Sequence, residues 1–251
     1  MKILYGLTTL TAALALGLTS TSAPAQDPAP VAADFKMKRC VNMGNALEAP
    51  NGAPWGRNYA KEDYERIKAA GFDTVRIPVR WSDYTGPAPS YRIHPDFAEL
   101  VDSNVKWALS SGLNVVLNVH HFEEIMEDPD NQMARFRAIW DQISLRYSKL
   151  PPNLWFEVLN EPHTNLKGQQ MRTLQRQAIE IIRRANPNRI IMLGGEEWSG
   201  IKSLGTNLAS DDPNVMYTFH YYDPFSFTHQ EATWLGDDMP KGKRGWGSSA
   251  D

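Results

Sequence analysis

Cysteine is almost absent from this chain, since Cys40 is the one cysteine among 251 residues. A disulfide within the chain is therefore excluded. Cys40 precedes Val41 in an apolar segment, so we expect a buried and unreactive thiol. No Cys and His residues have the spacing of a zinc finger, and the sequence does not predict a structural zinc site.

A strong charge of either sign is also lacking. The net charge is −3 and the basic residues are scattered along the sequence. This pattern gives no electrostatic footprint for nucleic acid, which we do not expect as a partner. No Gly-rich phosphate loop follows the first expected strand, so a dinucleotide is disfavoured and no cofactor is expected.

Long hydrophobic runs are missing apart from Ile3 to Leu18, which is too short to span a bilayer. Lys2 precedes this run and Ala23-Pro24-Ala25 follows it, so residues 1–25 are predicted to be a signal peptide. A membrane anchor is the alternative, although no stop-transfer pattern follows. Residues 26–38 are rich in Pro and Ala and are expected to form a flexible leader. We therefore expect a secreted protein, periplasmic or extracellular, that leaves the membrane after signal cleavage.

Short apolar runs alternate with longer amphipathic stretches over the rest of the chain, which is typical of a parallel α/β fold. The expected strands are Cys40 to Met43, Thr74 to Val79, Asn114 to Val119, Leu154 to Leu159, Arg189 to Leu193 and Val215 to Phe219. The expected helices are Lys61 to Ala70, Pro95 to Ser111, Asn131 to Leu150 and Gly168 to Ala185. Each helix is followed by Gly or Pro, the usual residues at a helix end.

Polar side chains stand at the end of almost every expected strand. They are Asn45, Glu48, Arg80, His120, His121, Asn160, Glu161, Glu196, Glu197, His220 and Tyr222, and the second strand carries Arg76 within it. An open doubly wound sheet concentrates its ligand at one switch point, whereas a barrel gathers residues from many strand ends. Six contributing strands therefore favour a barrel.

The strand from Leu154 stops abruptly on Asn160-Glu161-Pro162, because proline cannot continue a central strand. Glycosidic bond cleavage needs one protonated carboxyl group that donates to the leaving oxygen, and Glu161 suits that role. Enclosure by apolar walls and a neighbouring carboxylate would raise its pKa. A surface salt bridge at a strand end is the alternative interpretation.

Arg76 lies within an expected strand, where a guanidinium must find acceptors. We favour an arginine that positions a catalytic carboxylate over the alternative, a structural partner of Glu157.

Two histidine motifs accompany Glu161. His220 and Tyr222 are two residues apart and share one face of a strand end. His120 and His121 alternate across their strand, so at most one of them should contact a reacting sugar. A histidine pair can also bind metal, but no third ligand stands at a recognisable spacing, so no metal is expected.

Aromatic residues follow the strands rather than lying within the expected helices. They are Trp55, Trp81, Trp198, Tyr221, Phe225 and Trp234. Several such rings around a carboxylate indicate platforms for sugar rings, although any single one could simply cap the barrel.

These motifs together resemble glycoside hydrolase family 5, the cellulase family, over about Arg39 to Trp234. The matching pieces are Asn42-Met43-Gly44-Asn45-Ala46-Leu47-Glu48, Val75-Arg76-Ile77-Pro78, Asn118-Val119-His120-His121-Phe122, Leu159-Asn160-Glu161-Pro162, His220-Tyr221-Tyr222 and Pro224-Phe225-Ser226-Phe227-Thr228-His229-Gln230. The resemblance implies a TIM-type (β/α)8 barrel, a retaining mechanism and the bacterial endo-β-1,4-glucanase type.

The same resemblance assigns roles to individual residues. It implies Glu161 as general acid/base, Asn160 as the hydrogen-bond partner of the sugar 2-hydroxyl, and further residues around the reaction centre, namely Arg76, His120, His220 and Tyr222. Substrate-binding positions would be Asn45, Glu48, His121 and Trp234. The implied substrate is a β-1,4-linked glucan, with mannan and xyloglucan as alternatives.

One departure from the family concerns its nucleophile, a Glu in a Gly-Glu-Phe-Gly type motif on strand seven. Leu235 to Asp251 is polar and Gly-rich, without a strand pattern. We therefore expect one barrel domain over residues 39–235 that is incomplete, with about six units, strands seven and eight missing, and an irregular tail at residues 236–251. Strands one and six would then have open edges. A complete barrel would be expected as a monomer.

A substitute nucleophile is not expected either. Glu196 and Glu197 are the local candidates, but they would approach Glu161 from the side instead of across the barrel mouth. The chain is then expected to be C-terminally truncated and inactive, or to be a non-catalytic glucan-binding remnant.

Overall fold

A computed structural model describes residues 34–247, so the predicted signal peptide and most of the predicted leader lie outside the described residues. The centre is a six-stranded sheet in which the strands pair in chain order. All five pairings are parallel. The strands are β1 (Cys40–Asn42), β2 (Thr74–Ile77), β3 (Asn114–Asn118), β4 (Leu154–Glu157), β5 (Ile191–Gly194) and β6 (Val215–Thr218). The predicted strand–helix alternation is confirmed.

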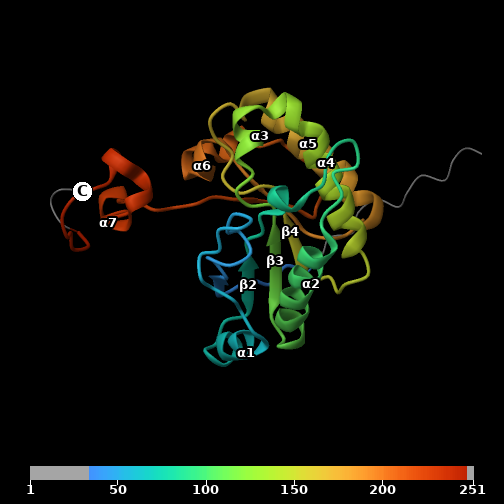
Figure 1. Cartoon of the computed structure of the whole chain (residues 1–251), viewed down its shortest axis with the longest axis horizontal. Coiled ribbons are helices and arrows are strands. Elements are labelled where there is room, and N and C mark those ends of the chain that lie inside the picture. The colour runs from blue at the N-terminus through green and yellow to red at the C-terminus, as the bar shows by residue number, and fades with distance from the viewer. Residues whose placement is uncertain (1–33, 248–251) are drawn as a thin grey trace, which may run out of the picture.

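Four long helices connect the strands and lie outside the curved sheet (Figure 1). They are α1 (Lys61–Ala69), α2 (Pro95–Ser110), α4 (Pro129–Arg146) and α5 (Gly168–Ala185). Shorter elements occupy the loops: α3 (Glu123–Glu127), α6 (Glu196–Ser199), α7 (Phe225–Thr228) and the 3-10 helices η1 (Trp81–Tyr84), η2 (Ile201–Thr206) and η3 (Thr233–Asp238). This arrangement is six units of a TIM-type barrel.

The core lies between the sheet and its helices. All residues of β4 are buried, as expected for a parallel strand covered on both faces. Trp140 on α4 packs edge-on against Phe156 at 5.5 Å and donates its indole N–H to the Val158 carbonyl at 3.0 Å. A buried indole that keeps its hydrogen bond avoids the cost of an unpaired donor.

The predicted helix at Asn131 to Leu150 is shifted in the structure. It begins two residues earlier, because Pro129 occupies the first helical position and the Asp128 carboxylate accepts from the Asn131 N–H. It ends at Arg146, after which the Leu150 N–H bonds to the Tyr147 carbonyl in a separate turn.

The sheet of the described residues does not close. Its order runs from β1 to β6 without a pairing between the two. Cys40, predicted to be buried, is exposed because β1 is an edge strand. Desolvation by the surrounding protein still raises the pKa of its thiol to about 11, which favours the unreactive thiol form.

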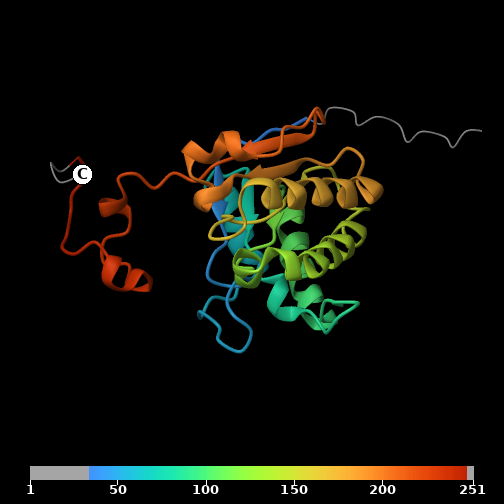
Figure 2. The same cartoon turned by 90° about the horizontal axis from the view of Figure 1, so that it is seen from above.

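The segment after β6 extends away from the rest of the molecule in both views (Figures 1 and 2). It contains α7 and η3. Within residues 34–247 no helix is long and apolar enough to cross a membrane.

Residues 34–39 pack onto the end of the sheet opposite the strand carboxyl ends. Phe35 lies with its ring centroid 4.5 Å from that of Trp155. The Asp73 carboxylate accepts hydrogen bonds from the backbone N–H groups of Lys38 and Arg39. The described end of the predicted leader is thus held against the sheet.

Candidate functional site

The carboxyl ends of the strands carry backbone conformations that are rare for residues other than glycine. Asn45, His121, Glu161 and Glu197 have φ angles of 65°, 50°, 47° and 55°. Each of these residues lies a few residues after the end of its strand, where the left-handed conformation changes the direction of the chain. Such strain is costly and tends to gather at functional sites.

Arg76 forms the electrostatic centre of this rim. Its Nε and Nη2 donate to the two carboxylate oxygens of Glu157 at 2.6 and 2.7 Å. Nη2 also donates to Asn160 Oδ1 at 2.8 Å, and Nη1 donates to Asn42 Oδ1 at 3.1 Å. The pairing with Glu157, the less favoured interpretation of the sequence, is the one observed.

Burial opposes both charges of this pair, but mutual attraction outweighs it. Glu157 is only 3% exposed. Burial raises the pKa of Glu157, but the charge and hydrogen bonds of Arg76 lower it by more. The net pKa therefore lies below the ordinary glutamate value. The bidentate geometry is the strong form of a carboxylate–arginine contact.

Glu161 lies directly after Asn160 in the loop that follows β4, and it faces His220, which follows β6. His220 Nδ1 and Glu161 Oε1 are 2.6 Å apart, and Asn160 Nδ2 donates to Glu161 Oε2 at 3.2 Å. Because Asn160 Oδ1 is held by Arg76, the amide can present only its N–H groups to Glu161.

The sequence predicted a raised pKa for Glu161, and among the described residues this prediction is wrong. Burial raises the pKa, but the hydrogen bond and charge of His220, followed by Asn160 and Arg76, bring it below the usual value. The groups that contact Glu161 are hydrogen-bond donors, and donors favour the carboxylate form. The neighbouring carboxylate invoked from sequence is not among its contacts.

His120 is neutral and has a defined tautomer. Burial is the main cause that holds its pKa well below the ordinary histidine value, with Arg76 as the next. Asn118 Oδ1 accepts from the Val79 N–H, so Asn118 Nδ2 must be the group that donates to His120 Nδ1 at 3.1 Å. The proton of the ring therefore lies on Nε2, where it can be donated to a ligand.

Asn45 and Glu48 form a tight turn after β1. The Glu48 carboxylate is 4% exposed and accepts from the backbone N–H groups of Asn45 and Ala46. A Cβ on Gly44 would lie 3.2 Å from Glu48 Oε1, so a larger residue there would press on the carboxylate. Glu48 thus stabilises the loop that presents Asn45.

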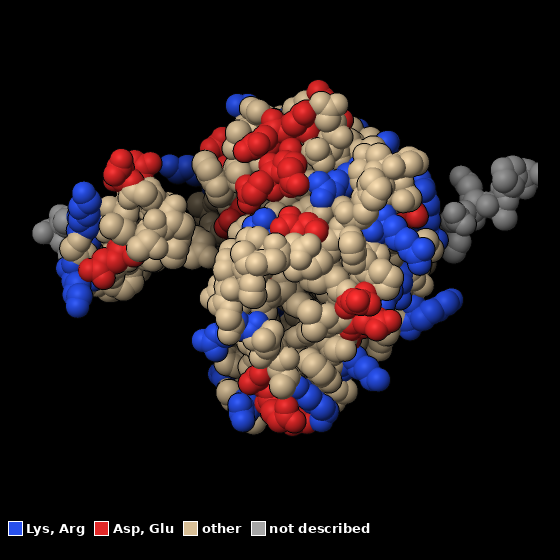
Figure 3. All heavy atoms as spheres, viewed as in Figure 1, with Lys and Arg blue, Asp and Glu red and all other residues tan. Residues whose placement is uncertain are grey.

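A second group of side chains lies beside the rim. His121 and His163 flank Glu123, with nitrogen–oxygen distances of 3.6 and 3.7 Å. His163 stacks on Trp198 with centroids 5.1 Å apart, and Trp55 meets the His121 ring edge-on at 5.8 Å. Acidic side chains gather over α3 beside this group (Figure 3). Half-exposed rings at both of its ends leave apolar faces free for a ligand.

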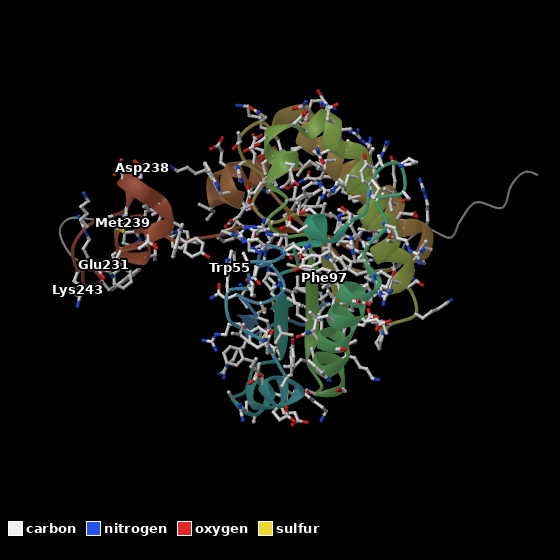
Figure 4. All side chains as sticks on the ribbon, in the orientation of Figure 1. Trp55, Phe97, Glu231, Asp238, Met239 and Lys243 are labelled. Carbon is white, nitrogen blue, oxygen red and sulfur yellow. The ribbon has the colours of Figure 1, made fainter. Side chains whose placement is uncertain are left out.

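Two predicted site residues make no contact with Glu161 among the interactions of the described residues. Tyr222 is exposed and its ring contacts His229 at 5.2 Å. Trp234 lies in η3, whose neighbours Glu231 and Asp238 are seen far from Trp55 in Figure 4. Their assignment to a substrate site stays a prediction.

Other residues differ from the sequence interpretation in burial. Trp81 is fully buried and donates its N–H to the Asn118 carbonyl at 2.9 Å, so it belongs to the core and is not a platform. Glu196, one of the two local candidates for a substitute nucleophile, accepts a hydrogen bond from the Gly168 N–H at 2.7 Å. Among residues 34–247, no three His, Cys, Asp or Glu side chains gather as metal ligands would.

Sequence reasoning missed the connecting role of Asn118, and it weighed Glu157 only as the less favoured partner of Arg76. Asn118 Nδ2 lies 3.4 Å from Glu157 Oε1 and so links the Arg76 pair to His120. The signal for Asn118 was present in the sequence, since a polar residue in an otherwise apolar, buried strand requires hydrogen-bond partners.

Comparisons with known proteins agree on one family. The family model described as cellulase, glycosyl hydrolase family 5, matches residues 35–248. Endoglucanase H of Acetivibrio thermocellus is 40% identical over 200 residues, which cover 79% of this chain and 22% of that protein. Endoglucanase B of Paenibacillus lautus is 32% identical over 74% of this chain and 38% of its own length. The chain thus spans less than two thirds of these curated relatives.

Solved structures give the same result. Endoglucanase Cel5A of Thermotoga maritima in complex with cellobiose has a TM-score of 0.79 and 42% identity, and the match covers 86% of this chain and 70% of that one. The same enzyme has also been solved in complex with mannotriose.

Proposed function

The chain belongs to glycosyl hydrolase family 5, the cellulases, and from this membership we propose that it carries the acid/base half of a retaining β-1,4-glucanase site. The observation that supports this most is the constellation at the end of β4. Glu161 is held there by Asn160 and His220, and Arg76 lies behind Asn160.

The geometry suits a proton donor and acceptor at a glycosidic oxygen. Glu161 lies at the barrel mouth and its side chain is 28% exposed, so a substrate can reach it. His220 bonds to Oε1 and Asn160 to Oε2, which fixes the plane of the carboxyl group. A fixed orientation of this kind is what general acid/base catalysis requires.

The depressed pKa of Glu161 has a direct consequence for this role. A general acid must be protonated when the leaving group departs, and here the surrounding donors favour the carboxylate. A retaining site places a second carboxylate about 5 to 5.5 Å away, and that negative charge raises the pKa of the acid. We propose that residues 34–247 lack this nucleophile and that they bind glucan without cleaving it.

A hydrolysis assay and a binding assay separate the two halves of the proposal. With the purified chain we expect no release of reducing sugar from carboxymethylcellulose, but retarded migration in affinity gels that contain the polymer. Trp198→Ala should weaken this retardation, because it removes one of the two stacked rings of His163 and Trp198. Leu145→Ala, at an exposed position on α4, serves as the matched control.

Each outcome has a defined meaning. Sugar release that disappears in Glu161→Gln would support Glu161 and refute the missing nucleophile. Absence of both release and retardation would refute a glucan site in this chain.

Mannan and xyloglucan stay open as alternative substrates. The mannotriose complex of the Thermotoga maritima enzyme gives mannan specific support. Affinity gels with glucomannan and xyloglucan beside carboxymethylcellulose would rank the three polymers.

We also propose export, on the basis of the predicted signal at residues 1–25. Mass spectrometry of protein recovered from the medium or periplasm should show an N-terminus at Gln26.

A further inference from the structure

Arg76 contacts one carboxylate, that of Glu157, and two amide oxygens, those of Asn42 and Asn160. Two of its nitrogens contact Glu157, and one of these two also contacts Asn160. Asn160 in turn donates to Glu161, so a single amide separates the guanidinium from the Glu161 carboxylate. A cation in this position could pair with either carboxylate.

The sheet register explains why Glu157 is the partner. β2 and β4 lie on either side of β3, and side chains from alternate strands share a layer inside a barrel. Arg76 pairs in register with Val116, whereas Glu157 is level with Asn118, two residues further along β3. The guanidinium therefore reaches upward and across β3 before it meets a carboxylate.

From this geometry we propose that Glu157 is a positioning residue. It occupies Arg76 so that the guanidinium orients Asn160 through one hydrogen bond and does not pair with Glu161. Glu157 thereby leaves Glu161 free to exchange a proton, and it fixes the Asn160 amide with its N–H groups toward the mouth. This inference rests on the proposed acid/base role of Glu161.

Charged and titratable groups face the two carboxylates from several strands. Glu161 contacts His220, which follows β6, and it is also influenced by the charge of Arg76 on β2. Glu157 meets Arg76, His220 and the amide of Asn118. His120, buried beside Asn118, is held neutral. Arg76 is therefore the cation that a neutral residue at position 157 would release toward Glu161.

The test follows the titration of Glu161 directly, without turnover. The purified chain is labelled with 13C at the glutamate carboxyl groups, and the Glu161 signal is assigned with Glu161→Gln. In Glu157→Gln we expect the midpoint of Glu161 to move to lower pH, because the released Arg76 stabilises its carboxylate. A crystal structure of this variant should show Arg76 in contact with Glu161.

Asp212→Asn is the matched control. Asp212 pairs with Arg183 at 2.6 Å, and both side chains are mostly buried, but the pair lies before β6, at the opposite end of the strands. This variant should lose stability and leave the Glu161 midpoint unchanged. If Glu157→Gln does not fold, Glu157→Asp replaces it, because aspartate keeps the charge with a shorter reach. This variant should shift the Glu161 midpoint in the same direction by a smaller amount.

Two results would overturn the proposal. One is an unchanged Glu161 midpoint in folded Glu157→Gln and Glu157→Asp. The other is a crystal structure of Glu157→Gln in which Arg76 contacts Asn160 and not Glu161. Neither result would bear on glucan binding or sugar release, so failure of this inference differs from failure of the proposed function.

Discussion

The contact between His220 and Glu161 should make part of the stability depend on pH. The folded pKa of Glu161 is depressed, so the contact stabilises the fold above the unfolded glutamate pKa of about 4.3. This contribution is lost as the pH falls through the folded pKa. We expect His220→Ala to cost about 1 to 2 kcal/mol near pH 6 and progressively less toward pH 3, as measured by urea unfolding. His94→Ala, at an exposed histidine, should show no such trend; a constant difference would refute this assignment.

Residue types at strand ends could be predicted from the sequence, but their pairings could not. Asn160, Glu161, Arg76, His120 and His220 do meet at one end of the sheet, since parallel strands bring their carboxyl ends together. Whether Arg76 contacts Glu157 depends on strand register and on reach across β3, which sequence spacing does not encode. The pKa of Glu161 depends on the same three-dimensional neighbours.

At the scale of elements, Arg189 ties the end of α4 to the start of β4. It is 6% exposed and lies over the Phe156 ring at 5.1 Å. Burial is the main cause that lowers its pKa to about 10. Its acceptors are Asn186 Oδ1 and the carbonyls of Tyr147, Leu150, Pro151 and Leu154.

Arg189→Met should therefore destabilise the fold strongly. The substitution leaves several buried carbonyls without a donor, and we expect a loss of about 3 kcal/mol in the free energy of unfolding. Arg176→Met, at an exposed position on α5, should change it by less than about 0.5 kcal/mol. Equal effects of the two substitutions in urea unfolding would contradict this role of Arg189.

Arg189 also shows why element boundaries differ from those expected. It was placed in a strand because it precedes an apolar run, but β5 begins at Ile191. The side chain is used in hydrogen bonds to a loop that is distant in sequence, and such tertiary contacts override local pattern. The existence and order of the six strands were predictable, because each is a short apolar run separated from the next by a polar or amphipathic stretch.

At the scale of the whole molecule, the open edges of β1 and β6 should make the described domain self-associate. Unpaired strand edges present backbone donors and acceptors to other chains. Exposed rings lie on or next to β6, with Tyr217, Phe219 and Tyr221 at 43%, 44% and 60% exposure. An apolar face beside a free edge favours contact between copies.

Sedimentation velocity over a range of concentrations tests this expectation. The mass of the wild-type chain should rise with concentration, and Phe219→Lys should shift it toward the monomer, because a lysine beside a strand edge disfavours pairing. Leu145→Lys adds the same charge at an exposed position on α4 and should leave the association unchanged. If the chain stays monomeric at every concentration and unfolds cooperatively, the open edges of this sheet do not drive self-association.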